Sequence, residues 1–180
     1  MSCSSSSRLS TRVWAADDCL AEVLVDTPAR VLTSIPHVGV VRASNYGGAV
    51  GDITRFASSA QVYRLSGLVP RLYESAGKRR GGLAISREGK VELREAILEL
   101  GKGLRLGHPD FGAYARQMKQ RGKPGGVILC ALGHRANRLA FAMMRDQVGF
   151  DPRMWPAREA DGTPSRRKAD KLVGVDRPQG

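Results

Sequence analysis

Apolar residues recur at helical spacing over much of this chain, which predicts a mainly α fold. The clearest helix is expected over residues 90–105, where apolar positions separated by four, three and four residues share one face. Two further stripes follow it along the sequence. The three stripes are Leu93, Ile97, Leu100 and Leu104; Phe111, Tyr114, Ala115 and Met118; and Ile128, Leu132, Ala136, Leu139 and Met143. Because each stripe needs a partner to bury it, we expect a compact helical domain.

A tight turn between two short helical segments predicts a helix-hairpin-helix before these helices. Residues 29–33 and 40–46 have the pattern of short helices, and residues 35–39 have the pattern of the turn. The turn of such a motif can present backbone N–H groups to a phosphate. The predicted backbone contacts are His37, Val38 and Gly39. His37 occupies the position where these hairpins usually carry glycine.

Composition divides the chain into three parts. Residues 1–27 are weakly patterned and predict a weakly structured N-terminal remnant. Residues 28–150 contain the helical patterns and are expected to form the domain. Residues 151–180 are rich in charge and poor in large apolar side chains, which predicts a disordered basic tail.

The charge of the chain is strongly one-sided. Lys and Arg number 29 against 17 Asp and Glu, which gives a net charge of +12. From Phe111 to Arg145 there is no acidic residue, and the basic residues are Arg116, Lys119, Arg121, Lys123, Arg135, Arg138 and Arg145. One-signed polar faces suit a polyanion. Since the sequence has no apolar run of roughly 18 residues, DNA or another nucleic acid is favoured over a membrane.

The stretch around Ser75 carries the candidate chemistry. Ser75 follows a hydrophobic segment that ends in Gly67-x-x-Pro70, and it lies in a loop rich in Gly, Lys and Arg. Glycine lets the main chain approach closely and the cations neutralise a phosphate, so the hydroxyl suits contact with a phosphodiester. The composition of the loop by itself also fits a simple turn serine.

Basic residues near Ser75 and along the later helices are candidate phosphate ligands. Those near the serine are either clamps on a phosphate or solvated loop charges. Arg94 either reaches the same phosphate or joins a surface ion pair. The predicted phosphate ligands are Lys78, Arg79, Arg80, Arg87, Arg94, Arg121, Lys123, Arg135 and Arg138.

The residue pattern predicts no metal site and no cofactor bound by this chain alone. The three cysteines are widely spaced and the three histidines are scattered. The glutamates of the helix expected at 90–105 fit a solvated face paired with Arg94 and Lys102. The odd number of cysteines and the lack of an apolar leader pattern favour a reducing cytoplasm, in association with the nucleoid.

Several motifs occur in an order and spacing that resembles one protein family. They are Ile35-Pro36-x-Val38-Gly39, Gly51-Asp52-Ile53-x-Arg55-Phe56, Gly67-Leu68-x-Pro70, Glu74-Ser75, Ile85-Ser86-Arg87-x-Gly89, Leu93-Arg94 and Arg121-Gly122-Lys123-Pro124. Over residues 30–152 the chain is similar to the C-terminal domain of an insertion-sequence transposase family. This is the family of Piv-type DNA invertases and bridge-RNA-guided transposases.

The resemblance implies a DNA transposase or site-specific recombinase domain. Ser75 would be the nucleophile that attacks the DNA phosphodiester and forms a covalent phosphoserine link. The partners implied are DNA, a guide RNA and further copies of the chain in a homo-oligomer. In this family an N-terminal RuvC-like domain supplies four carboxylates that hold Mg²⁺, and a serine hydroxyl needs such a metal or a base to become a nucleophile.

The chain departs from the family pattern at three points. No RuvC-like pattern precedes the domain in the sequence, Ala76 replaces the glycine after the serine, and His37 replaces the hairpin glycine. We therefore expect a truncated element that lacks the activating carboxylates and is inactive alone. The alternative is a stand-alone, non-catalytic nucleic-acid-binding protein that uses the helix-hairpin-helix turn and the basic surface.

Overall fold

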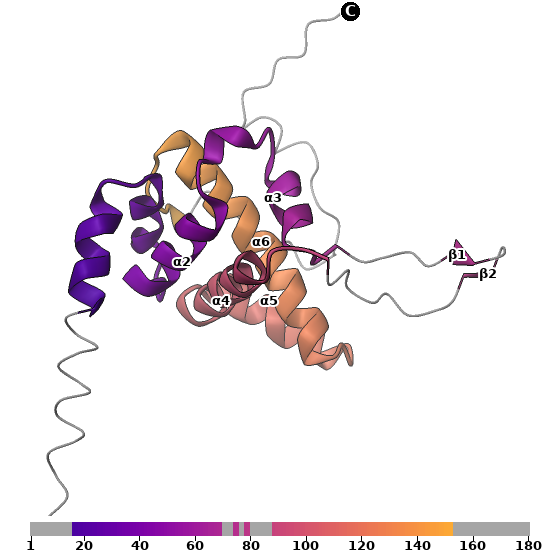
Figure 1. Cartoon of the computed structure of the whole chain (residues 1–180). Coiled ribbons are helices and arrows are strands. Elements are labelled where there is room, and N and C mark those ends of the chain that lie inside the picture. The colour runs from indigo at the N-terminus through magenta and orange to yellow at the C-terminus, as the bar shows by residue number, and fades with distance from the viewer. Residues whose placement is uncertain (1–15, 70–73, 76–77, 80–87, 153–180) are drawn as a thin grey trace, which may run out of the picture.

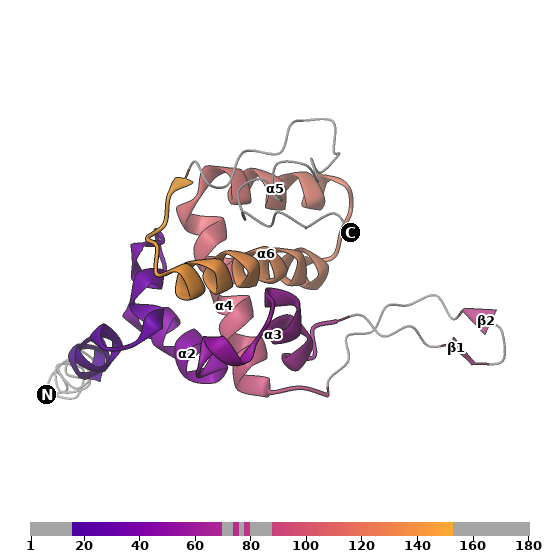
Figure 2. The ribbon, with the colours of Figure 1, turned by 90° about the horizontal axis from the view of Figure 1, so that it is seen from above.

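Helix α4 (Val91–Gly107) and helix α6 (Gly125–Asp146) cross at the centre of the molecule, as Figure 2 shows from above. The computed structural model describes residues 16–69, 74–75, 78–79 and 88–152. At the crossing, a Cβ on Gly101 would lie only 2.8 Å from the backbone nitrogen of Gly133. The two main chains therefore approach more closely than helices with side chains at the contact, whose axes lie about 8–10 Å apart.

Helix α5 (Pro109–Gln120) follows α4 after a sharp break at His108. The imidazole Nδ1 of His108 accepts a hydrogen bond from the Asp110 backbone N–H at 3.2 Å. Pro109 begins α5, a position where proline is favoured because no N–H is needed there. The residues of all three predicted stripes are buried or half-buried, and the prediction of a mainly α fold is confirmed.

The N-terminal half packs against this crossing through short helices. Residues 16–25 are helical. They are followed by the 3-10 helix η1 (Pro28–Ser34), helix α2 (Val40–Val50), the 3-10 helix η2 (Ile53–Arg55) and helix α3 (Ser59–Leu65). Gly47 lets η1 close on α2, because a Cβ at Gly47 would lie 2.5 Å from the Ala29 Cβ.

The segments on both sides of the predicted hairpin are helical, but the first is a 3-10 helix. In η1 the Thr33 hydroxyl donates to the Arg30 carbonyl oxygen at 2.8 Å, and the Ser34 hydroxyl donates to the Val31 carbonyl oxygen at 2.6 Å. These side chains compete for carbonyls that an α-helix would use, and they bridge three residues, the 3-10 spacing. The helix-hairpin-helix assignment itself stays a prediction.

A buried polar network joins α2, α3 and α6. The Tyr46 hydroxyl donates to Asn137 Oδ1 at 2.9 Å, and the Asn137 amide donates to the Ser59 carbonyl oxygen at 2.8 Å. Tyr46 and Asn137 have no exposed surface. Burial raises the pKa of the Tyr46 phenol above its usual range, so this hydroxyl remains a hydrogen-bond donor at neutral pH.

Ser75 lies in a short antiparallel pair, whereas the sequence predicted a loop. Strand β1 (Glu74–Ser75) pairs with strand β2 (Lys78–Arg79), with Glu74 opposite Arg79 and Ser75 opposite Lys78. Both views place this pair away from the helices (Figures 1 and 2). Two-residue strands are too short for an alternating apolar pattern, so the sequence contains no signal for them.

The predicted division into three parts depends on the two ends of the chain. Residues 1–15 and 153–180 lie outside the described residues, so the weakly structured start and the basic tail stay predictions. Within the described ranges, no helix has the length and apolar character needed to cross a membrane.

Candidate nucleic-acid interface

Helix α5, the turn after it and helix α6 carry a group of exposed cations that we call the α5–α6 basic surface. Its members are Arg116, Lys119, Arg121, Lys123 and Arg138. The two helices pack against each other, which gathers these charges on neighbouring elements. The sequence places no carboxylate between Phe111 and Arg145 to neutralise them. Such a surface suits phosphates, whose binding releases counterions from the nucleic acid.

Arg145 does not contribute to this surface. Its Nε and a terminal guanidinium nitrogen bond the two carboxylate oxygens of Asp146 at 2.7 and 2.8 Å. The hydrogen bond from Arg145 lowers the pKa of the Asp146 carboxyl, which keeps the pair charged. Asp146 is the residue directly after the acid-free stretch, so Arg145 lies within that stretch but is neutralised from outside it.

Arg135 has a fixed orientation between α5 and α6. Its guanidinium carbon lies 3.8 Å from the centre of the Tyr114 ring, and Nη1 donates to the Ala131 carbonyl oxygen at 3.2 Å. Stacking on an aromatic face preserves the positive charge while limiting side-chain motion. The predicted phosphate contact of Arg135 would therefore come from a side chain already held in place.

Arg94 holds together the two segments that flank Ser75 in the sequence. Its Nε donates to the Ser66 carbonyl oxygen at 3.1 Å. Gly89 lies against the same backbone, because a Cβ on Gly89 would be 2.5 Å from the Gly67 nitrogen. The phosphate contact predicted for Arg94 stays a prediction, and its hydrogen bond to a carbonyl is a role that sequence reasoning missed.

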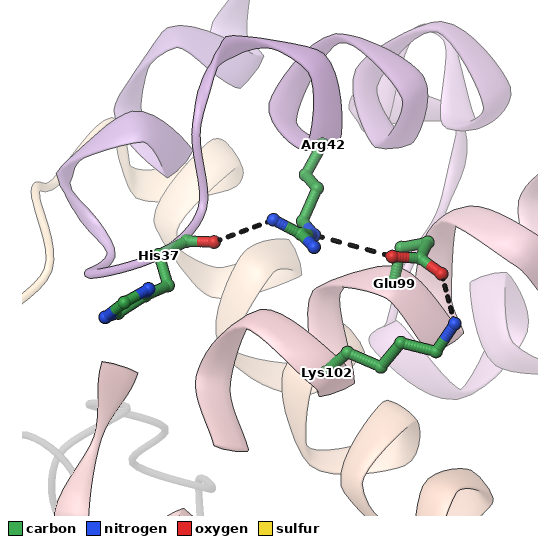
Figure 3. Close-up of polar contacts among 4 residues, drawn as sticks. All are labelled: His37, Arg42, Glu99 and Lys102. Carbon is green, nitrogen blue, oxygen red and sulfur yellow. Dashed lines mark hydrogen bonds and ion pairs between the residues drawn. The ribbon is translucent and has the colours of Figure 1, made fainter. Parts of the chain in front are cut away.

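The predicted hairpin is attached to α4 through Arg42. Arg42 Nη1 donates to the His37 carbonyl oxygen at 3.2 Å, and its Nε lies 3.5 Å from Glu99 Oε2 (Figure 3). Lys102 also pairs with Glu99, as the sequence predicted for this helix face. The hydrogen bond from Lys102 lowers the pKa of the Glu99 carboxyl, and Arg42 adds to the effect.

The three predicted hairpin contacts differ in their availability. His37 has a φ of 61°, the left-handed conformation that glycine adopts freely and that histidine enters more often than most residues. Val38 is buried and its N–H already donates to the Ile35 carbonyl oxygen at 3.0 Å. Gly39 is exposed at the N-cap of α2, and a Cβ there would meet nothing within 4 Å. Gly39 is therefore open to a phosphate, whereas the N–H of Val38 is already used within the turn.

The candidates nearest Ser75 are placed by the strand pair alone. Ser75 lies opposite Lys78, and Arg79 is the next residue of β2, so the backbone brings these cations to the same short hairpin. Arg80 and Arg87 lie outside the described residues. Their predicted phosphate contacts stay predictions.

The described residues do not provide a metal site. They contain no group of three or more His, Cys, Asp and Glu side chains able to hold a metal ion. The Mg²⁺ implied by the resemblance therefore has no ligand set among the described residues.

One cluster on α6 was missed by sequence reasoning. His134, one of the three histidines that the sequence shows as scattered, contacts the Tyr63 ring edge-to-face with ring centres 4.8 Å apart. The available signal was the spacing of His134 and Arg138, four residues apart on one helix face. The contact with Tyr63 joins two helices and has no counterpart in the local sequence pattern.

Comparison with known proteins assigns the part of the chain that contains the predicted hairpin, Ser75 and α4. Residues 29–114 match the family model described as Transposase IS116/IS110/IS902 family. This part of the chain belongs to that transposase family. The match includes the hairpin, the β1–β2 pair and α4, so the resemblance inferred from the motifs is confirmed.

Several relatives of this transposase family are similar to the chain over part of their length. The pilin gene-inverting protein of Moraxella bovis is 26% identical over 148 residues, which are 82% of this chain and 45% of that protein. The insertion element IS110 43.6 kDa protein of Streptomyces coelicolor is 32% identical over 124 residues, 69% of this chain and 30% of that protein. The transposase for insertion sequence element IS1111A of Coxiella burnetii is 39% identical over 71 residues, 39% of this chain and 19% of that protein. The chain thus spans less than half the length of these relatives.

Proposed function

We propose that this chain is a nucleic-acid-binding, serine-bearing domain of a transposase or DNA invertase. The observation that carries the proposal is the α5–α6 basic surface, an exposed group of cations with no carboxylate among them in the sequence. DNA is the proposed partner, since the family acts in transposition and a relative is named for gene inversion. A guide RNA is a further proposed partner, because the resemblance implies one and RNA presents the same phosphates.

Ser75 is the proposed nucleophile. Its Oγ would form a bond to a DNA phosphorus as the hydroxyl proton leaves and the bond from phosphorus to a deoxyribose oxygen breaks. A serine hydroxyl needs a base or metal for this step. The β1–β2 pair lies apart from the helices, which supports a division in which the activating groups come from a part of the protein outside this chain. We also propose that the chain acts as a homo-oligomer in the nucleoid-associated cytoplasm.

Removing charges from the α5–α6 basic surface is expected to weaken DNA binding and reduce its salt dependence. In Lys119→Gln/Arg121→Gln, the slope of log Kobs against log salt should become less negative by about 0.9 for each phosphate that the variant no longer binds. Fluorescence anisotropy with a labelled duplex measures this slope. The matched control is Arg30→Gln/Arg105→Gln, which removes two exposed cations outside the surface. A wild-type affinity that does not change with salt would contradict the proposal.

Ser75→Ala is expected to abolish covalent DNA attachment while leaving DNA affinity nearly unchanged. The assay combines this chain with the portion of a relative that it does not cover, and then scores DNA that stays bound to protein after denaturation in detergent. Ser58→Ala is the control, because Ser58 precedes α3 and its side chain makes no capping hydrogen bond. Attachment that persists in Ser75→Ala would rule out the nucleophile. If both wild type and Ser58→Ala bound DNA without covalent attachment, the non-catalytic alternative would be favoured.

A further inference from the structure

The side chain of His134 is positioned on the outer face of α6. This helix packs against α5 and α3, with α6 between them in Figure 2. The Tyr63 ring of α3 meets the imidazole edge-to-face, and the Tyr63 hydroxyl donates to the Cys130 carbonyl oxygen at 3.4 Å. His134 remains exposed beside this contact. One side of the imidazole is therefore supported by protein while the other is open to a ligand.

The groups that face His134 make its surroundings positive. On α6, Arg135 is the next residue and Arg138 lies one turn further along the same face. From α3 the facing group is Tyr63. Burial is the main cause that raises the pKa of its phenol to about 12, and the nearby Cys130 adds a smaller effect. Burial also raises the pKa of the Cys130 thiol, so both groups are neutral at pH 7. None of these neighbours offers a negative charge to an imidazolium.

The surroundings of His134 therefore favour its neutral form in the free protein. The loss of water on the side of the ring that meets Tyr63 lowers the pKa of the imidazole below its usual value, and the charges of Arg138 and Arg135 lower it further. A phosphate bound at Arg138 would place a negative charge beside the ring. The two guanidinium charges that oppose protonation would then be offset, and an imidazolium N–H would gain an acceptor.

We propose that His134 and Arg138 form a phosphate subsite in which the imidazole takes up a proton from solvent when a nucleic-acid phosphodiester binds. The proton is added to the free ring nitrogen, which then donates a hydrogen bond to a phosphate oxygen. Arg138 supplies the permanent charge and Tyr63 orients the ring. This inference rests on the proposed nucleic-acid binding. It adds His134 to the α5–α6 basic surface and couples binding there to the uptake of one proton.

Proton uptake fixes how affinity depends on pH. The imidazole pKa is lowered in the free protein, and a bound phosphate raises it in the complex. Affinity therefore rises as pH falls through the interval between these two values, and it levels off below the free-protein pKa. Well above the interval, the imidazole is neutral in both states and adds no pH dependence.

The first test compares wild type with His134→Gln. Between about pH 8 and about pH 6 at fixed salt, wild-type affinity for a labelled oligonucleotide should increase about three- to tenfold more than the affinity of the variant. The other two histidines are present in both proteins, so their titration cancels in the comparison. Arg105→Gln is the matched control, because it removes an exposed positive charge outside the α5–α6 basic surface, and it should keep the wild-type pH response.

A second measurement on wild type remains informative if the variant folds poorly. The imidazole NMR signal missing from His134→Gln should titrate below its usual range in the free protein and at higher pH with oligonucleotide present. Inorganic phosphate should shift it in the same direction. An imidazole pKa unchanged by the oligonucleotide, or equal pH dependence of binding in wild type and variant, would overturn this inference alone. If wild type bound no nucleic acid at any pH, the proposed function would fall with it.

Discussion

Gly101→Ala is expected to destabilise the domain by about 1–3 kcal/mol, although alanine ordinarily stabilises a helix interior relative to glycine. The new Cβ would lie 2.8 Å from the Gly133 nitrogen and 3.1 Å from both Gly133 Cα and the carbonyl carbon of Leu132. These neighbours are main-chain atoms, so no side-chain rotation can relieve the contact. Helix α6 would have to move away from α4, which would weaken the packing that buries both stripes.

A matched glycine in another helix should show the opposite sign. Gly48 lies in α2, is exposed, and a Cβ there would meet nothing within 4 Å. Gly48→Ala is expected to stabilise the domain by about 0.5–1 kcal/mol. Urea unfolding monitored by circular dichroism gives both changes as shifts in midpoint at constant slope. If both variants were stabilised equally, the close crossing of α4 and α6 would be refuted.

Asn137→Leu is expected to lower the free energy of unfolding by about 2–5 kcal/mol. The substitution would leave the Tyr46 hydroxyl and the Ser59 carbonyl without the partner they have in the native protein. An unsatisfied buried polar group costs about 1–3 kcal/mol, because it loses water and gains no protein partner. Leucine has the same number and branching of side-chain heavy atoms and is not smaller than asparagine, so little of the loss would come from an empty cavity.

A double-mutant cycle separates this polar effect from packing. Tyr46→Phe removes the phenol that Asn137→Leu would leave unpaired, so the double variant should lose less stability than the sum of the single variants. A coupling of about 1 kcal/mol is expected from urea unfolding of the four proteins. Simple additivity would mean that the bond from Tyr46 to Asn137 contributes little to stability.

Helix α6 contributes core residues on one face and residues of the proposed interface on another, and the two kinds are neighbours in the sequence. Gly133 and Asn137 face the other helices, while His134 and Arg138, each the following residue, lie on the exposed side. The helical period of 3.6 residues produces this arrangement, since positions four apart share a face and adjacent positions do not. Core substitutions that tilt α6 are therefore expected to disturb nucleic-acid binding as well, and binding data on such variants should be read with their stability.

The sequence by itself determined the local features of this protein. The stripes of α4, α5 and α6 follow from apolar spacing, and the break at Pro109 follows from proline chemistry. The motifs between Ile35 and Gly89 identified the transposase family. These features are readable because each depends on residues a few positions apart, where backbone geometry alone relates the side chains.

The tertiary structure alone decided which distant residues meet. The contact of Tyr63 with His134, the bond from Arg94 to Ser66 and the approach of Gly101 to Gly133 join residues that no local period relates. The segment predicted as a short helix before the hairpin is the 3-10 helix η1, packed on α2, and the pairing of β1 with β2 replaced a predicted loop. These contacts and pairings depend on how the helices pack and on which backbone carbonyls remain free. The spacing of apolar residues in the sequence contains neither kind of information.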